Sequence, residues 1–121
     1  MAVEELIESY PESIQALVRE ARKMVGVWLP EAQEGEDLSA RMFAYRYGPG
    51  YRGMICTLIL GKTGVKLGIV GGAALPDPHH LLRGAGKVHR HIQLKTSRDL
   101  LQSGVKELVL AAAGACNERL A

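Results

Sequence analysis

The chain has 121 residues, of which 47% are hydrophobic and 23% are charged, and its formal net charge is +2. This size and composition are typical of one ordinary globular domain and exclude a disordered chain. No apolar run approaches the ~18 residues of a membrane span, and the acidic start lacks the pattern of a signal peptide. We therefore expect a single soluble, cytoplasmic domain over residues 1–121.

The first third of the chain predicts helices followed by a linker. Residues 2–9 are expected to form a short leading helical turn, and Pro11 suits the first position of a second helix. That helix is predicted over 11–26 and ends at Leu29-Pro30. Residues 31–37 read as a polar, acidic connection. The apolar residues of the second helix recur at helical spacing: Ile14, Leu17, Val18, Ala21, Met24, Val25 and Trp28.

The middle of the chain predicts strands separated by glycine-rich turns. A strand over 39–47 ends at Gly48-Pro49-Gly50, and the apolar run 54–60 suits a central strand. The turn 61–64 contains two glycines and suggests a hairpin with a return strand over 65–70.

The last third predicts one more strand and a closing helix. The strand covers 88–94, with Val88, Ile92 and Leu94 on one face and His89, His91, Gln93 and Lys95 on the other. Ser97 is a candidate N-cap for a turn up to Gln102, with Asp99 near its positive end. The final helix, over 104–120, has an apolar stripe of Val105, Leu108, Val109, Ala112, Cys116 and Leu120.

This order of elements predicts an α+β fold. We expect an antiparallel sheet of about four to five strands, with strands 54–60 and 65–70 paired. The helices at 11–26 and 104–120 each have one apolar stripe, so both are expected on one face of the sheet.

Charge is distributed unevenly along the chain. Residues 1–40 hold nine acids and three bases, whereas residues 41–98 hold ten bases and one acid, Asp77. Such asymmetry can mark an interaction surface, but an acidic helix packed near a basic sheet would largely cancel the two fields. Cys56 and Cys116 lie far apart within apolar stretches, so we interpret both as buried small hydrophobes.

Several motifs resemble those of the YdhG-like family, a small bacterial domain of unknown function. They are Gly71-Gly72 with Leu75, Asp77-Pro78, Leu81-Leu82, Gly84-x-Gly86-Lys87, Arg90-His91-Ile92, and the earlier Tyr47-Gly48-Pro49-Gly50-Tyr51. The resemblance runs from about Tyr10 to the C-terminus. It implies a frataxin-like architecture and, because some members are described as iron chaperones, possible iron handling.

A frataxin-type iron surface would be an exposed acidic ridge that holds a hard cation through oxygen ligands. Glu4, Glu8 and Glu12 have the spacing of successive helical turns, although Pro11 would break a helix joining them. Further carboxylates are Glu5, Glu31, Glu34, Glu36 and Asp37. The alternative is that Glu12 complements a helix N-terminus and the others are solvated.

The four histidines are the second candidate metal ligands. His89 and His91 share one strand face, and His79 and His80 lie in the preceding loop near Asp77. Zinc or iron would need three or four converging ligands. The alternative is that the two histidines on the exposed strand face are solvated or hydrogen-bonded surface residues.

A third candidate is an anion site at the turn before the last strand. Arg83, Gly84, Gly86, Lys87 and Arg90 bring cations and approachable backbone amides together. A nucleotide-hydrolysing phosphate loop is excluded, since Leu81 and Val88 stand where its glycine and hydroxyl are required. The alternatives are a simple tight turn and a structural pair between Arg90 and Asp77.

These candidates favour binding over catalysis. We find neither a nucleophile elbow nor paired inward carboxylates, so an enzyme would have to use histidine as acid or base. Nucleic-acid binding through Tyr45, Tyr47, Tyr51, Arg46 and Arg52 is disfavoured by the 5% aromatic content. The expected partner is a small ligand, a metal ion or another protein, with iron the one cofactor considered.

Overall fold

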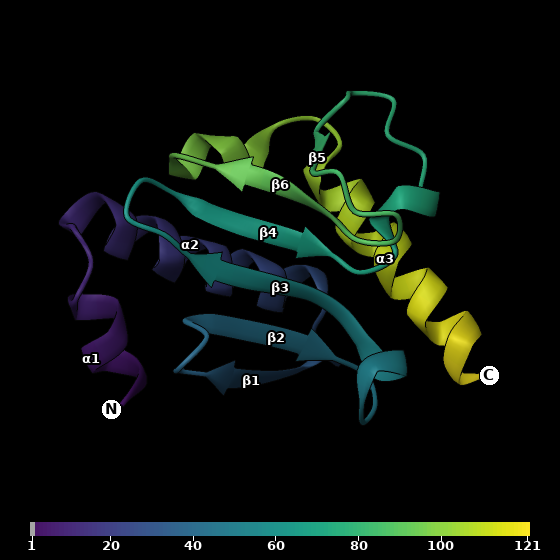
Figure 1. The fold of residues 1–121 in the computed structure, drawn as a ribbon, viewed down its shortest axis with the longest axis horizontal. Helices are drawn as coiled ribbons and strands as arrows, with labels where there is room; N and C mark the ends of the chain where they lie inside the picture. Colours follow the sequence, from purple (N-terminus) through teal and green to yellow (C-terminus); the bar gives the residue numbers. More distant parts are fainter. Residues whose placement is uncertain (1) are drawn as a thin grey trace.

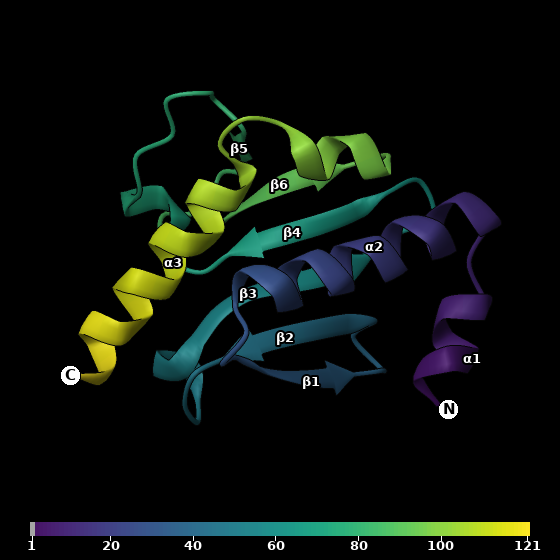
Figure 2. The ribbon, with the colours of Figure 1, turned by 180° about the vertical axis from the view of Figure 1, so that it is seen from behind.

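The computed structural model describes residues 2–121 and has two layers, a sheet and a pair of helices (Figures 1 and 2). Six antiparallel strands lie in the order β1-β2-β3-β4-β6-β5. The strands are β1 (Gln33–Asp37), β2 (Met42–Arg46), β3 (Met54–Leu60), β4 (Val65–Ile69), β5 (Leu82–Arg83) and β6 (Arg90–Leu94). The helices are α1 (Val3–Glu8), α2 (Glu12–Trp28) and α3 (Val105–Leu120). The α+β prediction is confirmed, with slightly more strands than expected.

The long helices α2 and α3 cover the same face of the sheet. They lie behind the strands in Figure 1 and in front of them in Figure 2. Phe43 of β2 points toward this layer, since the guanidinium carbon of Arg22 from α2 lies 4.5 Å from the centre of its ring. The opposite face of the sheet, which we call the open face, is not covered by any α-helix of residues 2–121.

The apolar pattern of α2 explains how it packs. Ile14, Leu17, Val18, Ala21 and Val25 are all buried, as their helical spacing predicts. Leu29 ends the helix directly before Pro30, whose preceding residue is disfavoured in helical conformation. Both cysteines are buried as expected, and burial raises the pKa of the Cys56 thiol to about 12.

The predicted hairpin of β3 and β4 is confirmed. The two strands pair antiparallel from Cys56 opposite Ile69 to Leu60 opposite Val65. The alternation of side chains along each strand then sends Leu58, Leu60, Val65 and Leu67 into the core, where all are buried.

The prediction of an irregular linker at 31–37 is wrong, because β1 occupies 33–37. All five of its residues are exposed, so the strand shows no alternation of apolar and polar residues. It pairs with β2, and its acidic side chains suit an outer strand that must avoid pairing with other chains.

Smaller corrections concern element ends. The two-residue β5 was not predicted, and β6 begins at Arg90, so Val88 lies outside the strand with 54% of its surface exposed. The cap before the turn at 97–101 is Thr96, and Asp99 accepts bonds from the amides of Lys95 and Thr96. Leu120, expected in the apolar stripe of α3, is 42% exposed at the end of the chain.

Candidate functional site

The register of the sheet brings four residues into one row on the open face. Thr57 of β3 lies opposite Gly68 of β4, and Gly68 lies opposite His91 of β6. On the far side, Arg83 of β5 lies opposite His91. The row therefore runs across four strands, with its smallest member in the middle.

A pocket of about 370 Å³ lies over this row. Its floor is formed by Thr57, Gly68 and His91. Residues further along the strands and their ends, with Tyr51 from the short helical turn at 51–53, form its sides. One side carries Ile59 and Lys66, and the other carries Tyr51, Met54, Val70 and His89.

Gly68 keeps the floor of the pocket low. A Cβ atom built on Gly68 would lie 2.4 Å from the hydroxyl oxygen of Thr57, so a side chain there would displace Thr57. Among residues 2–121, Thr57 is the one buried serine or threonine. A buried hydroxyl at the floor can donate to a ligand or accept from it.

The surroundings of His91 favour its neutral form. Partial burial lowers the pKa of its imidazole below the ordinary value of 6.5, and the positive charges of Lys66 and Arg83 lower it further. A neutral imidazole has one donating and one accepting nitrogen.

His89 and Tyr51 form a pair at the rim of the pocket. The Tyr51 hydroxyl is hydrogen bonded to Nε2 of His89, and the backbone amide of Gly71 donates to Nδ1 of His89 over 3.1 Å. The two rings meet edge to face with centroids 5.3 Å apart. Each ring nitrogen of His89 therefore has a partner.

The pocket is rich in cationic and neutral donors. Lys66, two histidines and two hydroxyl groups line it, whereas the guanidinium of Arg90, which also borders it, is bonded to the backbone carbonyl of Gly84. Among residues 2–121, none of those that line it is Asp or Glu. Its electrostatic character therefore favours a negatively charged ligand.

The structure does not gather the four histidines. His79 packs against Gly104 at the start of α3, and His80 lies near Arg83 and Gln93. Of the four histidines, two border the open-face pocket, His89 and His91. Within the part of the chain from 2 to 121, no group of three or more His, Cys, Asp or Glu side chains is arranged to hold a metal ion.

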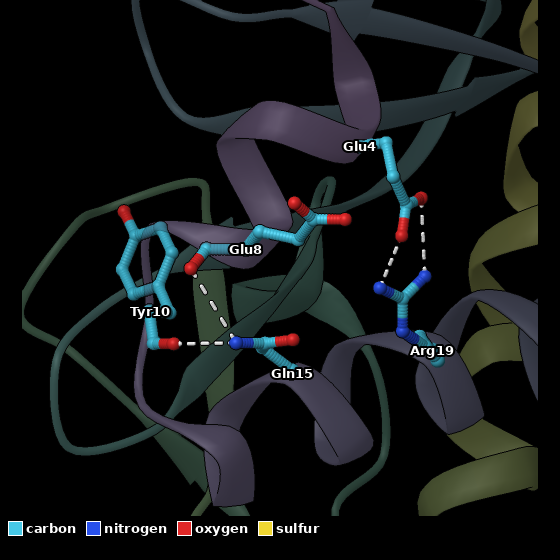
Figure 3. A network of polar contacts seen from close by, with 5 residues as sticks. All are labelled: Glu4, Glu8, Tyr10, Gln15 and Arg19. Atoms are coloured by element: carbon cyan, nitrogen blue, oxygen red, sulfur yellow. Dashed lines mark hydrogen bonds and ion pairs between the residues drawn. The ribbon is translucent and has the colours of Figure 1, made fainter.

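Figure 3 shows the polar contacts made by Glu4 and Glu8 of α1. The Glu4 carboxylate faces the Arg19 guanidinium and forms an ion pair with it, which lowers the pKa of Glu4. Glu8 contacts Gln15 through its backbone carbonyl rather than its carboxylate. Glu12 begins α2, a different helix from the one that carries Glu4 and Glu8.

In the turn predicted to bind an anion, Arg90 has a structural role. Its Nη1 donates to the backbone carbonyl of Gly84 over 3.0 Å, which closes the connection between β5 and β6. The expected pair with Asp77 is wrong, because the Asp77 carboxylate instead accepts from the amides of Leu81 and Leu82 at 2.9 Å. The carboxylate thus provides a hydrogen-bond acceptor for two backbone amides that lie close to it in the sequence.

The remaining members of that turn are Arg83, Gly84, Gly86 and Lys87, and all are exposed. Gly84 has φ +109°, the left-handed region that glycine adopts without strain. A Cβ on Gly86 would lie 2.9 Å from the carbonyl oxygen of His89. The glycines are therefore explained by the backbone of the turn.

The tyrosine and arginine set considered for nucleic acid is split between two faces. Tyr45 is buried on the helix side, where its hydroxyl donates to Glu34 over 2.5 Å. Arg52 is bonded to the backbone carbonyl of Arg119 near the end of α3. A continuous stacking surface is not formed by these residues.

Sequence reasoning missed Thr57, Lys66 and Gly68 as site residues. One signal was available, since a glycine inside an apolar strand often marks a close approach. Thr57 and Lys66 carry no local signal, because their position beside His91 depends on the pairing of three strands.

No family model, curated protein or solved structure matches the chain. The YdhG-like resemblance and the iron handling it implies therefore stay predictions from the sequence. Within residues 2–121, we find no helix with the length and apolar character needed to cross a membrane.

Proposed function

We propose that this protein binds a small organic anion in the open-face pocket. The observation that carries the proposal is the combination of Lys66 with the neutral donors of two histidines and two hydroxyl groups, in a pocket that, within residues 2–121, has no carboxylate in its lining. A negatively charged group would be attracted there and would meet several hydrogen-bond donors.

The shape and lining of the pocket support a ligand with an apolar body. Its volume of about 370 Å³ falls in the range of small-molecule sites. Met54, Ile59 and Val70 add apolar surface beside the polar floor. We therefore expect a carboxylate or phosphate group on an apolar ring or short chain.

Titrations followed by NMR test this proposal, with benzoate, benzamide and inorganic phosphate as probes. We expect benzoate to shift the amide signals of Thr57, Gly68 and His91, and neutral benzamide to bind more weakly. Lys66→Met should weaken benzoate binding about threefold to tenfold, because it removes a cation at the pocket. Lys62→Met is the matched control, since Lys62 lies in the β3–β4 turn outside the pocket.

The two lysine variants also test the cause of the lowered pKa of His91. Because Lys66 contributes to lowering the pKa of His91, Lys66→Met should raise that pKa toward 6.5, and Lys62→Met should leave it unchanged. Benzamide binding as tightly as benzoate, or equal losses in the two lysine variants, would contradict an anion site built around Lys66.

A further inference from the structure

The hydrogen bonds of His89 determine where its proton lies. A backbone amide can only donate, and the Gly71 amide points at Nδ1 of His89. Nδ1 must therefore accept this bond and carries no proton. A neutral imidazole has one N–H, so the proton is on Nε2.

This assignment sets the direction of the bond to Tyr51. Since Nε2 carries the proton, it donates and the phenol oxygen of Tyr51 accepts. The Tyr51 hydroxyl then keeps its own hydrogen for another acceptor. If Tyr51 donated to Nε2 instead, both ring nitrogens would have to be unprotonated, which is not an accessible state of histidine.

The surroundings of Tyr51 indicate which acceptor its hydrogen can reach. Tyr51 lines the open-face pocket, and its side chain is 57% exposed. The other polar lining residues are Thr57, Lys66, His89, Arg90 and His91, and among residues 2–121 the lining holds no carboxylate to compete for that hydrogen. An anionic oxygen in the pocket is the strongest acceptor available to a phenol.

We infer that His89 is held as the Nε2–H tautomer and orients Tyr51 to donate its hydroxyl hydrogen to the anionic group of the bound ligand. The tautomer of His89 does not depend on any ligand, whereas the hydrogen bond from Tyr51 to a ligand rests on the proposed function. His89 is a positioning residue in this arrangement and Tyr51 contacts the ligand. Tyr51 thereby selects for a ligand oxygen at the rim, beyond the general attraction of the cations.

The tautomer is tested without any ligand. Nitrogen NMR of protein with isotopically labelled histidine distinguishes a protonated from an unprotonated ring nitrogen, and the His89 signals are identified by their loss in His89→Gln. We expect Nε2 to be protonated and Nδ1 to be unprotonated near neutral pH. A protonated Nδ1 overturns the inference, whether or not any ligand binds.

The donation is tested with benzoate as the probe. Tyr51→Phe should weaken benzoate binding about tenfold or more, as expected for loss of a hydrogen bond to a charged group. Tyr47→Phe removes a hydroxyl outside the pocket and is the matched control. Unchanged affinity in Tyr51→Phe, together with a loss in Lys66→Met, overturns the donation while leaving the anion site intact.

Two substitutions at His89 separate positioning from packing. The amide nitrogen of Gln can take the place of Nε2–H, whereas that of Asn cannot extend as far. We expect His89→Gln to retain benzoate affinity within about twofold and His89→Asn to approach the loss of Tyr51→Phe. Equal losses of benzoate affinity in the two His89 variants would contradict a positioning role for His89. If the unaltered protein does not bind benzoate at all, both the proposed function and the hydrogen bond from Tyr51 to the ligand are wrong.

Discussion

Glu34 ties the outermost strand to the helical layer. Its carboxylate is paired with the Arg22 guanidinium, at 2.7 Å between Oε1 and Nη2, and accepts the Tyr45 hydroxyl on Oε2. Burial alone would raise the pKa of Glu34, but the bonds from Arg22 and Tyr45 outweigh it, so the pKa is lowered. The ionised form is therefore the one that stabilises the fold.

Glu34→Gln should lower the free energy of unfolding by about 1 kcal/mol at neutral pH, a modest value because 29% of the side chain is exposed. A depressed pKa contributes stability above the unfolded value of 4.5 that is lost as the pH falls through the lower folded value. Denaturant unfolding across this acidic range should thus show a flatter pH dependence in the variant. Glu36→Gln, on the same strand, is the control, and equal effects of the two substitutions would contradict a specific role for Glu34.

The central strands β3 and β4 pack closely where Gly68 faces the branched side chain of Thr57. A Cβ on Gly68 approaches the Thr57 hydroxyl to 2.4 Å, while Thr57 itself is buried. The pair therefore combines a packing constraint with the floor of the candidate site.

Gly68→Ala should lower the free energy of unfolding by about 1–3 kcal/mol, the range for overpacking a well-filled site. In the Thr57→Ala background the same change should cost much less, since the obstructing hydroxyl is gone. Denaturant unfolding of both single variants and the double variant measures this coupling. Additive effects would contradict the contact as the source of the cost.

At the scale of the whole molecule, the helix-covered core and the proposed binding pocket lie on opposite faces of the sheet. The helices α2 and α3 cover one face of the sheet (Figure 2), where they pack against apolar side chains of the strands. The open-face pocket lies on the other side. Substitutions on the two faces should therefore be separable.

Leu17 in α2 is 1% exposed and tests this separation. Leu17→Ala should lower the free energy of unfolding by about 2–5 kcal/mol, the usual cost of removing a buried leucine side chain. Benzoate affinity of the folded variant should change by less than about twofold. Lys66→Met should show the reverse pattern, and a joint loss of stability and affinity in both variants would show that the faces are coupled.

Local sequence patterns were sufficient to predict the helix α2 and the central hairpin of the sheet. The spacing of Leu17, Val18 and Val25 predicted α2, and the glycines of the turn at 61–64 predicted the β3–β4 hairpin. Burial of Cys56 and Cys116 followed from their apolar neighbours. These features depend on contacts between residues close in sequence or on the periodicity of one element, so the sequence alone determined them.

The edge strands and the candidate site were decided by tertiary structure. β1 is exposed along its whole length and exists through its pairing with β2 and the bonds of Glu34, neither of which leaves a periodic pattern. Thr57, Gly68 and His91 meet because of the registers of three strands. The sequence by itself determined the helices, the central hairpin and the presence of histidine and basic residues. Only the assembled sheet decided which of them share a pocket, because β6 follows β4 after a long connection and the two strands pair only in the tertiary structure.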